Sequence, residues 1–156
     1  MTADPERIYL AYLTESREIG ESTPHSPQHL TLVPPFEPKP QIAIEAVQAT
    51  KNHFRQFPIR ISERTNFGPD RDIPVYIVQP INILAALHNT LMDELQLRGI
   101  DTASLKYTRD NYQPHISIKP GQDKLEMGQK LVIDHIAVMQ KSQKARTVLA
   151  KEELEQ

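Results

Sequence analysis

Apolar and polar residues alternate along the chain with two different periods, and both predict short regular elements. The β-branched and aromatic run IYLAYL at residues 8–13 is typical of a strand buried on both faces. The polar, proline-containing residues 14–28 predict a loop, and HLTLV at 29–33 predicts a second strand. Because Pro34 and Pro35 have no backbone N–H to give to a ladder, we expect this strand to stop before them.

Helical spacing occurs in two places. Residues 40–54 begin with a proline, which suits a first helical turn, and their apolar residues recur every three or four positions. After Pro80, four leucines fall on one helical face before Gly99, a residue typical of a helix end. These leucines are Leu84, Leu87, Leu91 and Leu95.

The remaining apolar runs predict strands. FPIRISE at 57–63 and DIPVYIVQ at 72–79 flank turn residues at 66–70 and predict a hairpin. A short strand bounded by prolines is expected within 112–121. Residues 130–154 predict two strands around a polar turn at 141–144. Because no linker divides these elements, we expect one domain over residues 1–156, built from two lobes.

The composition narrows the class of protein. A chain of 156 residues is long enough for one domain with a sizeable core. Its net charge of −2 argues against a surface that holds long duplex nucleic acid. The absence of cysteine excludes disulfides, a thiol nucleophile and a cysteine zinc site. The first residues do not follow the pattern of a signal peptide, and no apolar run has membrane-spanning length, so we expect a cytoplasmic protein without a membrane partner.

A four-letter pattern is written twice in predicted strands. HLTL begins at His29, and HISI begins 86 residues later at His115. Side chains two apart in a strand share a face, so His29 lies beside Thr31 and His115 beside Ser117. The intervening apolar residues point the other way, into a core. Each segment therefore presents an imidazole together with a hydroxyl that can hold a phosphate oxygen.

A third copy of the pattern, at His88, serves as a control because it lies in the second predicted helix. Residues two apart in a helix are about 200° apart around its axis, so His88 and Thr90 cannot face one ligand. The letters alone are therefore weak evidence. Their position in a predicted strand and their flanking turn residues distinguish His29 and His115 from His88.

Two such strands, brought face to face, would place two imidazoles on opposite sides of one phosphorus. A neutral histidine can then take a proton from the attacking oxygen while a protonated one gives a proton to the leaving oxygen, and the hydroxyls hold the non-bridging oxygens. This chemistry needs no metal or other cofactor, and we expect none.

The paired motifs, in a chain of this length, resemble the 2H phosphoesterase superfamily, in particular its 2′-5′ RNA ligase-like branch of RNA 2′,3′-cyclic phosphodiesterases. The resemblance implies an α+β fold with pseudo-two-fold symmetry, in which two small antiparallel sheets with outer helices surround a central groove. It implies that His29 and His115 are the acid–base pair and that Thr31 and Ser117 bind phosphate. Lys119 follows the second motif where relatives often place a basic residue, which implies a role in phosphate binding.

Several readings of single residues stay open. Tyr112 and Phe36 flank the motifs and can stack on a base, although such residues more often fill a core. Zinc binding by His29 and His115 lacks an evident third ligand. His135 sits in an apolar strand without a hydroxyl partner, so it is not assigned to the site.

These observations predict a phosphoric diester hydrolase that opens 2′,3′-cyclic phosphates of RNA ends or nucleotides to 2′-phosphates, acting as a monomer. Within the same chemistry, the alternatives are a 2′-5′ or cyclic oligonucleotide phosphodiesterase and a 2′-5′ RNA ligase. From other classes, the alternatives are a non-catalytic module that binds RNA ends or nucleotides and a purely structural interaction protein. The sequence does not decide which histidine is the acid.

Overall fold

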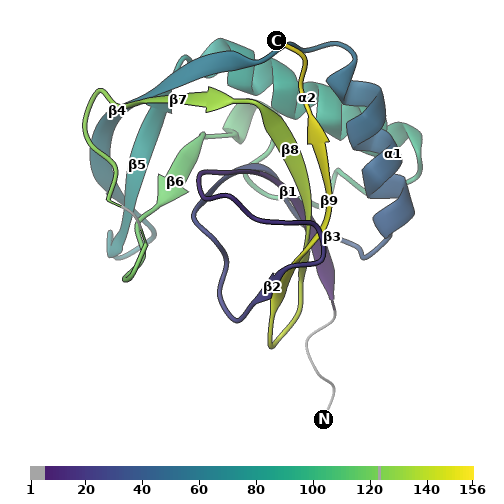
Figure 1. The fold of residues 1–156 in the computed structure, drawn as a ribbon, viewed down its shortest axis with the longest axis horizontal. Helices are drawn as coiled ribbons and strands as arrows, with labels where there is room; N and C mark the ends of the chain where they lie inside the picture. The colour runs from purple at the N-terminus through teal and green to yellow at the C-terminus, as the bar shows by residue number, and fades with distance from the viewer. Residues whose placement is uncertain (1–5, 123) are drawn as a thin grey trace.

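A single antiparallel sheet organises the molecule (Figure 1). The computed structural model describes residues 6–122 and 124–156, and in these the strand order is β2-β9-β8-β1-β3-β6-β5-β4-β7. Together with the two α-helices found in these residues, the sheet gives the predicted α+β architecture. The strands are β1 (Arg7–Leu13), β2 (Ser22–Thr23), β3 (His29–Phe36), β4 (Phe57–Phe67), β5 (Ile73–Gln79), β6 (His115–Ser117), β7 (Lys130–Ile133), β8 (His135–Lys141) and β9 (Arg146–Glu153).

Both helices cover the same face of this sheet, which we call the helix face. Helices α1 (Pro40–Lys51) and α2 (Ile81–Leu97) lie side by side, with α1 against β8 and β9 and α2 against β3 (Figure 1). The four leucines predicted to share one side of the second helix are all fully buried there. Burial of such side chains, each worth about 1.5–3 kcal/mol, stabilises the main core.

The opposite face carries a second, smaller apolar cluster. Successive residues of β1 point to alternate faces, so Ile8, Leu10 and Tyr12 join the main core while the residues between them join the smaller cluster. The run IYLAYL is thus buried on both faces, as its composition predicts. The smaller cluster consists of Tyr9, Ala11, Leu13, Ala137, Met139 and Val148.

The sheet divides into two lobes at its narrowest joint. Strands β3 and β6 pair through a single position, Leu30 opposite Ile116. On one side lie β2, β9, β8, β1 and β3, the first lobe, and on the other lie β6, β5, β4 and β7, the second lobe. The two predicted sheets are therefore continuous with each other, and the joint is made by the two motif strands.

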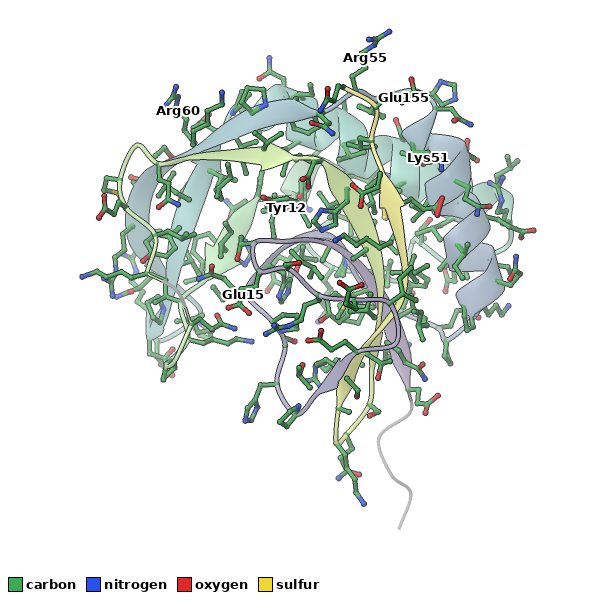
Figure 2. All side chains as sticks on the ribbon, viewed as in Figure 1. Tyr12, Glu15, Lys51, Arg55, Arg60 and Glu155 are labelled. Atoms are coloured by element: carbon green, nitrogen blue, oxygen red, sulfur yellow. The ribbon has the colours of Figure 1, made fainter. Side chains whose placement is uncertain are left out.

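The sheet also bends back on itself. Only Asp134 separates β7 from β8, although these strands stand at the far edge and near the opposite edge of the strand order. Two Cα–Cα steps of about 3.8 Å cannot cross a flat sheet of this width. Figure 1 shows β7 running directly into β8. Near the same end the Gln56 N–H donates to the Glu155 carbonyl at 2.8 Å, and Arg55 lies close to Glu155 (Figure 2).

Three sequence predictions of strand boundaries are wrong. Strand β3 continues through Pro34 and Pro35 to Phe36, because register shifts in its pairing with β1 move the prolines out of the ladder and β6 is too short to reach them. Strand β4 extends to Phe67, so the hairpin turn is shorter than expected. Residues 130–154 form three strands, because the first pairs with β4 and the other two with the first lobe.

Two short elements complete the fold. Strand β2 lies inside the segment predicted as a loop, and a short 3-10 helix, η1 (Arg109–Asn111), precedes β6. Neither carries an apolar periodicity that the sequence could reveal. In the part of the chain that the structure describes, no helix is both long and apolar enough to cross a membrane.

Candidate active site

The two motif strands are neighbours, and all four motif side chains lie on the face turned away from the helices, which we call the motif face. Leu30 and Ile116, which pair with each other, are fully buried in the main core. Alternation along each strand therefore turns the residues on either side of them to the opposite face. Antiparallel pairing from this register sets His29 beside Ser117 and Thr31 beside His115, a diagonal arrangement of two imidazoles and two hydroxyls.

Both imidazoles are oriented by a hydrogen bond from Nδ1 to a backbone carbonyl. The Nδ1 of His29 donates to the Pro27 carbonyl at 2.7 Å, and the Nδ1 of His115 donates to the Gln113 carbonyl at 2.7 Å. A carbonyl only accepts, so the bond fixes the proton of the neutral ring on Nδ1. Among the described residues, neither Nε2 has a hydrogen-bond partner. Each ring therefore keeps its reactive lone pair available.

Burial and nearby cations keep His29 neutral. Its pKa is lowered to about 4, first by burial and further by the positive charges of Lys119, His115 and Arg146. The bond to the Pro27 carbonyl favours the protonated ring but does not offset these effects. At neutral pH His29 is thus a free base with an open Nε2, which is the state needed to accept a proton.

Lys119 lies where its charge acts on His29. Its own pKa is lowered by burial and by the charges of Arg146 and Lys141. The side chain is nevertheless solvent-exposed, so it is open to a ligand on the motif face. Its role in phosphate binding stays a prediction.

Tyr112 is packed behind the first motif. Its ring stacks on His88 with centroids 4.1 Å apart and planes at 5°, and its hydroxyl donates to the Thr31 carbonyl at 2.8 Å. This geometry ties Tyr112 to the strand that carries His29. Its predicted contact with substrate is not tested by these bonds. Phe36, the other aromatic residue considered for stacking, is buried in the main core.

The histidines outside the motifs have structural partners where they are buried. The Nδ1 of His88 donates to the Leu32 carbonyl at 2.6 Å, and its Nε2 accepts from the Arg109 N–H at 2.9 Å. His135 bonds through Nδ1 to Asp134 at 2.6 Å and accepts the Leu13 N–H at 3.1 Å. With both ring nitrogens occupied, neither histidine can exchange a proton without losing one of these hydrogen bonds. The copy of the motif in α2 is therefore a packing element.

Sequence reasoning missed three residues next to the catalytic candidates. Tyr9 lies with its ring centroid 5.3 Å from that of His29, and Phe67 meets the His115 ring edge-on at 4.9 Å. Arg146 acts on His29 from β9. Tyr9 and Phe67 sit in runs that read simply as strands, and Arg146 sits among other polar residues. Only knowledge of which strands pair could have brought them to the site.

No metal site accompanies the motifs in the described part of the chain. Within residues 6–122 and 124–156, no group of three or more His, Cys, Asp or Glu side chains is placed to hold a metal ion. The zinc alternative therefore has no third ligand among these residues.

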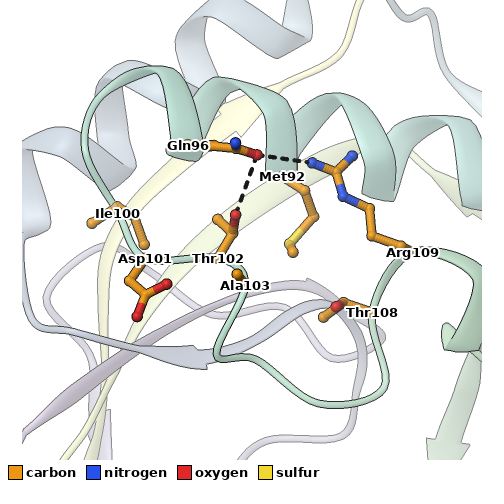
Figure 3. A pocket seen from close by; sticks show the side chains of 8 residues that line it. All are labelled: Met92, Gln96, Ile100, Asp101, Thr102, Ala103, Thr108 and Arg109. Atoms are coloured by element: carbon orange, nitrogen blue, oxygen red, sulfur yellow. Dashed lines mark hydrogen bonds between the residues drawn. The ribbon is translucent and has the colours of Figure 1, made fainter.

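A pocket of about 360 Å³ lies elsewhere, between α2 and the segment after it (Figure 3). There the Gln96 Oε1 accepts long hydrogen bonds from the Thr102 hydroxyl at 3.4 Å and from Arg109 at 3.5 Å. Because α2 covers the helix face, this pocket is separate from the motif residues.

Comparison with known proteins identifies the class. A crystal structure described as a phosphoesterase shares the fold, with a TM-score of 0.63 and 16% identity over 98% of this chain and 100% of that one. TT0787 of Thermus thermophilus gives a TM-score of 0.65 and 17% identity, covering 95% and 97% of the two chains. LigT of E. coli complexed with NADP+ gives 0.61 and 16%, covering 99% and 100%. The fold is thus that of the 2H phosphoesterases, as the paired motifs predict.

The family model of the 2'-5' RNA ligase superfamily matches residues 7–149. The chain belongs to this superfamily. A comparison with curated protein sequences gives no significant match.

Proposed function

We propose that the protein is a cyclic phosphodiesterase that opens 2′,3′-cyclic phosphates, on RNA ends or nucleotides, to 2′-phosphates without a metal. The observation that carries this proposal is the matched pair of imidazoles, each with Nδ1 bonded to a carbonyl and Nε2 open, beside two hydroxyls on one face. A small nucleotide substrate is consistent with structures of E. coli LigT, which shares the fold and was crystallised with 3'-AMP, with NADP+ and with phosphate. We further propose a cytoplasmic, monomeric protein of one domain.

The histidines take different roles in hydrolysis. His29 is neutral at physiological pH, so its Nε2 takes the proton of the attacking water. The water oxygen bonds to phosphorus, and the bond from phosphorus to the 3′ oxygen breaks. His115, protonated on Nε2, gives its proton to that oxygen, while Thr31 and Ser117 donate to the non-bridging oxygens. The product carries a 2′-phosphate and a free 3′-hydroxyl.

Phosphorus NMR of adenosine 2′,3′-cyclic phosphate and of a short RNA with a cyclic end, in EDTA, tests this function. Wild type is expected to form the 2′-phosphate, and His29→Ala and His115→Ala each to lose at least about 10²-fold in rate, because each removes one acid or base. His25→Ala is the matched control, since His25 is an exposed loop residue. Wild-type binding without turnover would instead support a nucleotide-binding module, and turnover only in EDTA-free buffer would contradict metal independence.

Ligation is the second candidate, favoured by the family to which the chain belongs. In ligation a 5′-hydroxyl replaces water as the group that attacks the cyclic phosphate and the 3′ oxygen again leaves, so the two histidines keep their roles. Incubating RNA with a 2′,3′-cyclic end and RNA with a 5′-hydroxyl end distinguishes the two reactions, because only ligation gives a longer product.

A further inference from the structure

Three cations, Lys119, Lys141 and Arg146, form a group on the motif face, and the charges of Lys119 and Arg146 also act on His29. Lys141 and Arg146 are direct partners in the ladder of β8 and β9, so their side chains leave the sheet on the same side. That side is the motif face, because Met139 and Val148, two residues away on the same strands, belong to the smaller apolar cluster. The charges of both Lys141 and Arg146 lower the pKa of Lys119, which places the third cation near them.

A chain of contacts through Ser26 connects this group to the catalytic candidates. The Ser26 hydroxyl lies 3.3 Å from the Tyr9 hydroxyl, and the Tyr9 ring lies against His29. Arg146 donates through Nε to the same Ser26 hydroxyl at 3.1 Å. The Ser26 carbonyl accepts from Gln122 at 2.9 Å, which holds the segment after Lys119 against the 14–28 loop. Arg146 is therefore held next to the first motif, and the segment after Lys119 is held against the same loop.

These positive charges have no counter-ion in the described part of the chain. Arg146 is half-buried and donates through Nε and Nη1 to neutral oxygens only, those of Ser26, Ser142 and Ala145. Its Nη2 makes no hydrogen bond to the described residues. Within residues 6–122 and 124–156, no acidic side chain lies within ion-pair distance of Lys119, Lys141 or Arg146. A chain of net charge −2 that concentrates cations at one spot offers an anion site there.

We propose that Lys119, Lys141 and Arg146 bind a second phosphate group of the substrate, beyond the phosphate that reacts between the two motifs. This inference rests on the proposed function for the place of the reacting phosphate. Arg146 bonds only uncharged oxygens and keeps Nη2 available among the described residues, so its guanidinium can donate to a phosphate oxygen. The two lysines add positive charge. The group joined to the 5′ oxygen of the terminal ribose is the nearest further phosphate. It is either the next diester of an RNA chain or a terminal 5′-phosphate.

Calorimetric binding of the expected products tests the second site without requiring turnover. At low salt, wild type is expected to bind adenosine 2′,5′-bisphosphate about tenfold more tightly than adenosine 2′-phosphate, the gain typical of one charged contact. Arg146→Gln and Lys141→Gln should each bring this ratio close to one. Lys144→Gln is the matched control, because Lys144 lies in the same hairpin turn but does not act on Lys119; it should keep the ratio.

A dinucleotide ending in a 2′-phosphate distinguishes the sources of the second phosphate. A gain with the dinucleotide supports an RNA chain, and a gain with the bisphosphate alone supports a terminal phosphate. Equal wild-type affinities for all three compounds overturn the inference, as does a ratio that survives both Arg146→Gln and Lys141→Gln. If wild type does not open cyclic phosphates but keeps the tenfold affinity ratio between bisphosphate and monophosphate, only the proposed function is refuted. If wild type turns over cyclic phosphates but binds the two compounds equally, only the second site is refuted.

Discussion

His29 and His115 are prepared for proton transfer by the backbone rather than by carboxylates. Each bonds through Nδ1 to the carbonyl two residues earlier. A carbonyl fixes the tautomer, but unlike a carboxylate it adds no negative charge to stabilise the protonated ring. The pKa of His29 can therefore stay low in the free protein. An anion at the site would supply the missing negative charge.

Binding of phosphate should consequently raise the pKa of His29. Its value of about 4 reflects burial and the repulsion of Lys119 and Arg146, and an anion offsets that repulsion. NMR titration of the His29 ring is expected to give a pKa near 4 alone and a clearly higher one with adenosine 2′-phosphate. Lys119→Gln should raise the value in the free protein. The same pKa with and without ligand would contradict this account of the site.

At the scale of elements, the joint between the lobes depends on side chains as much as on the ladder. Strands β3 and β6 share only the pair Leu30 and Ile116. Across the joint, the Tyr112 hydroxyl bonds the Thr31 carbonyl, and His88 bonds both the Leu32 carbonyl and the Arg109 N–H. These bonds hold the segment before β6 to β3, and with it the spacing of the motifs.

Tyr112→Phe removes one of these bonds while keeping the ring that stacks on His88. The free energy of unfolding should fall by about 1 kcal/mol, the usual net worth of such a hydrogen bond. Urea unfolding measures this change. Tyr107→Phe is the control, because Tyr107 is 77% exposed. Equal stabilities of the two variants would show that the Thr31 bond contributes nothing to the joint.

The elements differ in how far the sequence predicts them. Strand and helix positions follow from periodicity, so α2 and the two motif strands are found where they are expected. The pairing of strands does not follow from periodicity. Alternation shows which face of the sheet a residue lies on, but not which strand lies beside it. The residues missed at the site, Tyr9, Phe67 and Arg146, are those brought there by pairing or by contact across the sheet. The motif residues were predicted because their chemistry is repeated in the sequence.

For the whole molecule, histidines kept neutral by partial or full burial imply sensitivity to acid. Burial is the first cause of the lowered pKa values of His29, His88 and His135. In the unfolded chain each would titrate near 6.5, so the unfolded state binds more protons at lower pH. The contribution of these groups to stability is full above pH 6.5 and is lost as the pH falls through their lowered pKa values, which for His29 is about 4.

Urea midpoints between pH 7.5 and pH 4.5 should therefore decrease steadily. For His29 alone the loss is at most about 3 kcal/mol, since one pKa unit corresponds to about 1.4 kcal/mol. His29→Gln is expected to flatten the decrease, and His25→Gln, at an exposed position, to leave it as in wild type. A midpoint that does not change over this range would contradict the assignment of neutral buried rings.

The order of strands in space has a consequence for synthesis of the chain. Strand β1 lies between β3 and β8, and β8 follows every strand of the second lobe along the sequence. A ribosome thus delivers β3, which carries His29, early. Strand β8, which pairs with the other edge of β1, emerges only after His115. Contacts between residues so distant in sequence form slowly, because a long loop must close first. The nascent protein therefore cannot assemble the first lobe until β8 and β9 have been translated.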